Sequence, residues 1–167
     1  MKKSVFTFFI FFISFISFSQ NKKYCNQIKE RIDKFDKDTL YYTPTNGAKG
    51  WVNFKKFKEN KNDKIFMYLS VFNKNLSGVE KGVDIILVNG ERISKQFESV
   101  KITSEVVSGG GGAGYLYEAF FRLDEEEIDL LISSPISDYR INVFEGKPVK
   151  KYAKNFYPEY LKCLKEL

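Results

Sequence analysis

The chain has 167 residues, a formal net charge of +6, 17 Phe, two Cys and no His. The absence of His excludes catalytic triads and dyads built on imidazole, and every zinc site that needs an imidazole ligand. A chain of this length fits one domain.

The first 19 residues have the pattern of an export signal. Two Lys near the N-terminus precede an apolar run, residues 5–18, which holds seven of the 17 Phe. A run of about fourteen residues is shorter than the ~20 that a membrane-spanning helix needs. Ser17 and Ser19 then supply the small side chains of a cleavage site. We therefore expect residues 1–19 to be a signal peptide and residues 20–167 to be one exported domain, periplasmic or secreted; an uncleaved anchor is the alternative.

The mature chain begins with a helical pattern over residues 22–38. Cys25, Ile28, Ile32 and Phe35 recur at spacings of three and four residues, with charged residues between them. We expect one amphipathic helix here.

The middle of the chain has the two-residue period of strands. We expect strands over residues 51–58, 64–73, 83–88 and 91–97, the last two joined by a hairpin at Asn89-Gly90, where both turn residues would take positive φ. Residues 64–73 are apolar on both sides, which is typical of a central strand covered on both faces. Further strands are expected over residues 101–107, 115–123 and 139–146.

Two further helices follow from capping and spacing signals. Asp124 and Glu127 have the spacing of a capping box, so a short helix should begin there and end at Pro135. A C-terminal helix should begin with Pro148 in its first turn. It should be kinked or split near Pro158, whose ring and missing N–H disrupt helices.

The two Cys lie near opposite ends of the mature chain. Export permits disulfides, and a bridge from Cys25 to Cys163 would close a loop of about 139 residues, worth on the order of 4–5 kcal/mol in the chain-entropy model. We expect this bridge to join the terminal helices; two buried free thiols are the alternative. The fold class is α+β, with an antiparallel sheet or sandwich-like core and helices at both ends.

Part of this pattern resembles small exported β-rich proteins of Gram-negative bacteria. The resemblance covers residues 115–144, which include Arg122-Leu123-Asp124-Glu125-Glu126 and Asp138-Tyr139-Arg140-Ile141, and the terminal Cys163-Leu164 pair. It implies the fold class and export, and carries over no catalytic residue.

A glycine-rich segment between two expected strands is the most conspicuous motif. Its glycines have the spacing of a dinucleotide fingerprint, but a strand follows where that fingerprint needs a helix. We interpret the segment as a hairpin tip and as a candidate contact loop, because binding residues favour loops. The loop glycines are Gly109, Gly110, Gly111, Gly112 and Gly114.

Nothing in the sequence selects a catalytic pair, a cofactor or a metal ion. The acidic cluster Asp124, Glu125, Glu126, Glu127 and Asp129 begins a helix and lacks the turn of a calcium loop. Basic residues concentrate in segments 49–64 and 147–165, and acids in segment 118–129; these are solvated faces or patches that steer a charged partner.

We therefore expect an exported, non-enzymatic domain that binds a protein partner in the cell envelope, for example as an inhibitor or immunity-type protein. The competing hypothesis is a carboxylate-dependent hydrolase or a glycan-binding protein, which would need a cleft lined by Trp51 or Tyr side chains beside two converging acids. ATP, NAD and nucleic acids are unexpected partners for an exported chain.

Overall fold

The computed structural model describes residues 23–32, 38–44, 52–58, 63–109, 112–148 and 156–167. A six-stranded antiparallel sheet has the order β1 (Lys29–Ile32), β2 (Thr39–Tyr42), β3 (Val52–Lys58), β4 (Lys64–Asn73), β8 (Gly112–Arg122), β7 (Lys101–Gly109). A four-stranded antiparallel sheet has the order β10 (Phe144–Gly146), β9 (Ile136–Ile141), β5 (Val83–Leu87), β6 (Arg92–Lys95). The helices are η2 (Phe97–Ser99), α2 (Glu125–Ser133) and α4 (Tyr157–Glu166). The α+β class is confirmed, with antiparallel sheets predominating.

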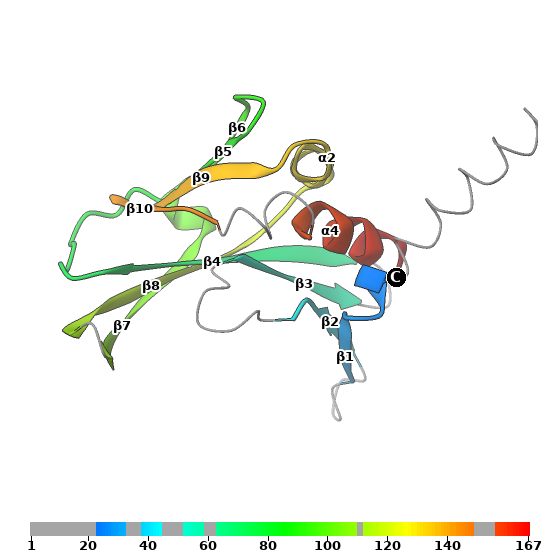
Figure 1. Ribbon diagram of the computed structural model, residues 1–167, viewed down its shortest axis with the longest axis horizontal. Coiled ribbons are helices and arrows are strands. Elements are labelled where there is room, and N and C mark those ends of the chain that lie inside the picture. The colour runs from blue at the N-terminus through cyan, green and yellow to red at the C-terminus, as the bar shows by residue number, and fades with distance from the viewer. Residues whose placement is uncertain (1–22, 33–37, 45–51, 59–62, 110–111, 149–155) are drawn as a thin grey trace, which may run out of the picture.

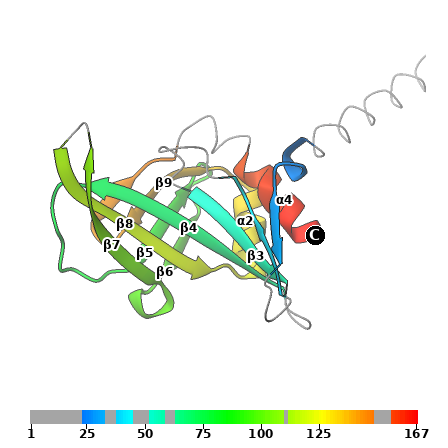
Figure 2. The ribbon, with the colours of Figure 1, turned by 90° about the horizontal axis from the view of Figure 1, so that it is seen from below.

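The four-stranded sheet and both α-helices lie on one side of the six-stranded sheet (Figure 1). One continuous hydrophobic core joins them. Its fully buried members include Phe54 and Met67 from the large sheet, Ile85 and Ile141 from the small sheet, and Leu161 from α4. The other face of the six-stranded sheet is turned toward the reader in the view from below (Figure 2).

Strand β4 lies inside the large sheet, between β3 and β8, as its sequence predicts. Its two faces differ in burial. Met67 and Leu69 are fully buried in the core, whereas Phe66 and Tyr68 on the opposite face are only partly buried. The expected coverage of both faces of β4 is therefore incomplete. On the second face, the Phe66 ring packs against rings of the neighbouring strands and not against a covering layer.

The predicted helix over residues 22–38 is wrong. Residues 23–25 are helical, residues 26–27 form a turn, and β1 then pairs with β2 in the register Lys29 to Tyr42. Pairing with a strand satisfies the backbone here, and this tertiary contact overrides the local helical spacing. Residues 33–37, the end of the predicted helix, lie outside the described residues.

The C-terminal helix is confirmed over Tyr157–Glu166. A kink or split near Pro158 stays a prediction, because it concerns the junction with residues 149–155. Helix α4 begins at Tyr157, so Pro158 lies in its first turn, where the missing N–H costs no intrahelical bond. Residues 149–155, where the helix was expected to begin, lie outside the described residues. Helix α4 buries Tyr160, Leu161 and Leu164.

Two turns differ in detail from their predictions. The hairpin at Asn89-Gly90 is present, but only Gly90 has a positive φ, of 90°. The Gly90 N–H donates to the Leu87 carbonyl at 3.0 Å and the Leu87 N–H to the Glu91 carbonyl at 2.9 Å, so a three-residue loop ends in a left-handed glycine.

The predicted strand over residues 139–146 is two strands. Asn142 takes a φ of 56° and turns the chain, so that Ile141 of β9 pairs with Phe144 of β10. The Asn142 side-chain oxygen accepts hydrogen bonds from the N–H groups of Lys81 and Gly82. These long-range contacts hold a turn that no Gly or Pro marks in the sequence.

The disulfide is confirmed between Cys25 and Cys163, with the Cα atoms 5.3 Å apart. It joins the first helical residues to α4. Aromatic packing surrounds it, since the Tyr24 ring meets the rings of Phe156 at 5.2 Å and Tyr160 at 6.0 Å. The Tyr160 hydroxyl donates to the Gln27 side-chain oxygen at 2.6 Å.

Candidate functional site

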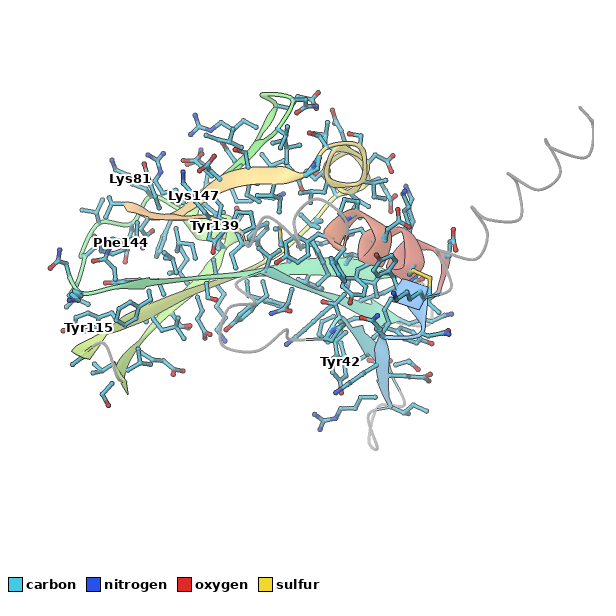
Figure 3. All side chains as sticks on the ribbon, viewed as in Figure 1. Tyr42, Lys81, Tyr115, Tyr139, Phe144 and Lys147 are labelled. Carbon is cyan, nitrogen blue, oxygen red and sulfur yellow. A yellow bond between two sulfur atoms is a disulfide. The ribbon has the colours of Figure 1, made fainter. Side chains whose placement is uncertain are left out.

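The outer face is the side of the six-stranded sheet that points away from the core. Side chains alternate between the two sides of a strand, and residues directly opposite each other on neighbouring strands share a side. The strand registers therefore identify the members of the outer face. Figure 3 shows one of them, Tyr42, pointing away from α4 and the four-stranded sheet.

A central row crosses five strands of the outer face. The registers pair Lys29 with Tyr42, Tyr42 with Lys55, Lys55 with Phe66, and Phe66 with Arg122. Cations and aromatic rings thus alternate along the row. Because neighbouring strands lie about 4.8 Å apart, the three cations are spaced by roughly 10 Å.

Two flanking rows extend the same chemistry on either side of the central row. One contains Arg31, Leu40, Phe57 and Lys64, and the other contains Asn53, Tyr68, Phe120 and Lys101. These three rows form the basic end of the outer face, with six cations and no acid among the described residues. The next two rows carry Glu118 and Glu105 and form its acidic end.

The rings of the basic end pack against one another. Phe66 and Phe120 stack with centroids 4.8 Å apart and an interplanar angle of 6°, and the Phe57 ring meets Phe66 edge-on at 5.3 Å. The Lys55 ammonium lies 5.7 Å from the centroid of the Phe120 ring, a cation–π distance. The rings therefore form a fixed apolar floor between the cations.

Tyr68 stands at the border between the basic and acidic ends. Partial burial, followed by a hydrogen bond to Glu118 and the charges of Glu118 and Glu105, raises the pKa of the Tyr68 hydroxyl well above its usual range. Tyr68 therefore stays neutral at physiological pH and donates a hydrogen bond to Glu118.

A second surface feature is a cavity of about 280 Å³ on the small sheet. Its lining residues are Asp84, Ile86, Arg92, Asp138, Tyr139, Arg140 and Glu145. Asp84 accepts hydrogen bonds from Arg92 Nε at 3.0 Å and Ser94 Oγ at 2.7 Å, and also from Arg140. Partial burial would raise the pKa of Asp84, but these hydrogen bonds and the charge of Arg92 hold it at about 2.

Asp138 in the same cavity is also held in its charged form. Hydrogen bonds from Ser137 and Lys147, together with the charge of Lys147, lower its pKa. A glycosidase needs one carboxyl that stays protonated near neutral pH as the general acid. Asp84 and Asp138 are both shifted in the opposite direction, so this pair does not supply that acid.

The acidic cluster at the start of α2 is explained by pairing inside the fold. Glu127 forms an ion pair with Lys95 at 2.5 Å, and Lys165 on α4 reaches Asp129 at 2.6 Å and Glu125 at 3.2 Å. Three acids of the cluster are thus paired with Lys95 and Lys165 inside the fold. Over the described residues, no group of three Cys, Asp or Glu is arranged to hold a metal ion.

Both strands that flank the glycine-rich segment extend into it. Gly109 of β7 pairs with Gly112 of β8, so the strands continue almost to the tip. Gly114 also lies in β8, where a Cβ would come within 2.4 Å of the Phe72 ring. Gly110 and Gly111 lie outside the described residues, as does Trp51, so the contact loop stays a prediction.

The central row is the feature that sequence reasoning missed. Each of its five residues comes from a different strand, so the row does not form a motif along the sequence. A partial signal exists, since Lys55 and Phe57, Phe66 and Tyr68, and Phe120 and Arg122 are each two residues apart. Each pair therefore shares a strand face.

None of the helices in the described ranges is both long and apolar enough to cross a bilayer. The chain matches no family model, no curated protein and no solved structure.

Proposed function

We propose that the chain is an exported, non-enzymatic binding protein that acts on a protein partner in the cell envelope, in the manner of an inhibitor or immunity-type protein. The central row carries this proposal. Aromatic residues and Arg are enriched in protein interfaces relative to the rest of the surface. Here Tyr42, Phe66 and Arg122 lie in one row on the side of the sheet that faces away from the core.

Asp84 and Asp138 of the small-sheet cavity lack the raised pKa that a general acid needs. Asp84 is held ionised by two Arg and one Ser, and Asp138 by Lys147 and Ser137. Hydrogen bonds and ion pairs of this kind stabilise a fold. The competing hydrolase hypothesis needs a carboxyl with a raised pKa, and neither acid of this pair supplies one.

Export is supported by two independent features. The first 19 residues have the order of a signal peptide: basic residues, an apolar run and small residues. The Cys25–Cys163 disulfide suits an oxidising compartment.

The proposal is tested by producing the full chain with a C-terminal tag in the organism that encodes it. We expect the protein in the envelope or medium fraction, with an intact mass that corresponds to a chain beginning at Gln20. After mild crosslinking, we expect it to retain a stoichiometric protein partner. Retention in the cytosol with the first 19 residues intact, or recovery of the chain alone, would contradict the proposal.

A further inference from the structure

We infer that the outer face recognises a bipolar protein surface: an acidic strip that crosses the basic end, beside a neutral or basic patch that meets the acidic end. This inference rests on the proposed function and adds the chemistry and the orientation of the partner.

The cations of the basic end form a regular array. Lys29, Lys55 and Arg122 lie on alternate strands, so they are roughly 10 Å apart along the central row. Lys29 and Arg122 at the two ends of the row are exposed. Carboxylates on a partner that crosses the strands can meet each cation in turn, and complementary charge raises association rate and selects against wrong partners.

The acids of the acidic end favour a protein partner over a uniformly charged polymer. Glu118 lies opposite Thr103, one row beyond Tyr68, and Glu105 lies one row further. Rows are separated by two residues along the strands, which is about 7 Å. A nucleic acid or an acidic polysaccharide that spread over the whole face would bring negative charge against these acids. A protein surface can place acids at one end and bases at the other.

The packing of the rings points the same way. Phe66 and Phe120 each have one face occupied by the other, and the Phe57 edge contacts Phe66. Proteins that bind single-stranded nucleic acids stack successive bases on open aromatic faces. Here the rings instead form an apolar floor, which suits side-chain contacts at a protein interface.

The size of the face matches one side of a protein complex. The five rows occupy nineteen register positions. At about 4.8 Å by 7 Å each, these positions give an area on the order of 600 Å². Standard complexes bury about 800 Å² per partner. The outer face therefore provides most of the surface that a stable complex needs.

The test begins with a photoreactive residue in place of Tyr42 on the outer face, and separately in place of Val88. Val88 is 67 % exposed at the β5–β6 hairpin of the small sheet. Each full-length variant is irradiated in the organism that encodes the chain, and the captured protein is identified, purified and used as the binding probe. We expect capture through position 42 and not through position 88.

Binding of that purified protein is then measured for three charge reversals: Arg122→Glu, Lys29→Glu and the matched control Lys81→Glu. Arg122 and Lys29 are exposed ends of the central row, while Lys81 is an exposed residue on the side of the small sheet (Figure 3). We expect a loss of about 10-fold in affinity for each of the first two and less than ~2-fold for the control. The losses should shrink as salt is raised, because salt screens exposed charges. Reversing one acid on the partner should restore the binding of Arg122→Glu.

Three outcomes would overturn the inference in different ways. Capture through position 88 alone would leave the proposed function standing and place the interface elsewhere. Equal losses of affinity for all three charge reversals would show that the central row has no specific role in binding. Immobilised oligothymidylate or polygalacturonate that binds the chain more tightly than the captured protein does, with a loss in Arg122→Glu, would assign the face to a polyanion. Capture through neither position, together with recovery of the chain alone after mild crosslinking, would contradict the proposed function itself.

Discussion

The Asp84 side chain is hydrogen-bonded to residues of two neighbouring strands in the small sheet. It lies on β5, and its carboxylate accepts hydrogen bonds from Arg92 and Ser94 on β6 and from Arg140 on β9. The side chain is 20 % exposed, so these bonds are only partly screened by water. One carboxylate therefore links three of the four strands.

The first prediction concerns the pH dependence that Asp84 confers. Its pKa of about 2 in the folded chain lies below the ordinary 3.8, so its contribution to stability is present above about pH 4 and is lost as the pH falls towards 2. Asp84→Asn should lower the free energy of unfolding by about 1 kcal/mol at pH 6, and the difference from the parent chain should vanish near pH 2. Urea denaturation across this range measures it. Glu98→Gln, at an exposed acid on η2, is the control, and a difference that persists at pH 2 would contradict the assignment.

At the scale of elements, α2 is held at its N-terminus by reciprocal hydrogen bonds. The Asp124 carboxylate accepts from the Glu127 N–H at 2.9 Å, and the Glu127 carboxylate accepts from the Asp124 N–H at 3.0 Å. Glu127 also pairs with Lys95 of β6. The capping box thus both begins the helix and fastens it to the small sheet.

The second prediction is that Asp124→Ala costs about 1 kcal/mol of unfolding free energy, because the Glu127 N–H loses the carboxylate that accepts its hydrogen bond. Glu126→Ala removes an exposed acid from the same turn without touching the box, and should change stability by less than about 0.5 kcal/mol. Thermal and urea unfolding of the two variants give the comparison. Equal losses would mean that charge in the first turn, and not the cap, stabilises α2.

At the scale of the whole molecule, the disulfide joins the two ends of the described chain. Cys25 and Cys163 are 138 residues apart in sequence. Cys163 is buried in α4, and the surrounding rings of Tyr24, Phe156 and Tyr160 pack edge to face. A bridge of this span restricts the unfolded chain much more than a short loop would.

The third prediction is that the double variant Cys25→Ser, Cys163→Ser loses on the order of 4–5 kcal/mol of unfolding free energy by the chain-entropy model. Urea denaturation of the double variant and of the parent chain, with and without reductant, measures the loss. The reduced parent should match the double variant, and reductant should leave the variant unchanged. A loss below about 1 kcal/mol would show that native packing, rather than the bridge, holds the termini together.

Local signals in the sequence predicted those features whose causes lie within a few residues. The alternation of Ile65, Met67 and Leu69 predicts β4, and Asp124 with Glu127 predicts the start of α2. Asn89-Gly90 predicts a hairpin because few residues tolerate its backbone geometry. The Cys25–Cys163 pairing was also predicted, since the chain has only two Cys.

Tertiary structure decided the features that depend on which strands become neighbours. Residues 29–32 have helical spacing yet form a strand, because β2 offers them backbone partners. Asn142 turns the chain only because the backbone at residues 81–82 lies within hydrogen-bonding distance. The central row exists because five separate strands are placed in one order and register. The sequence by itself determined the central strands, α2 and the C-terminal helix with their apolar faces, whereas only the paired sheet brought Lys29, Lys55 and Arg122 into one line, since a line across strands has no counterpart along the chain.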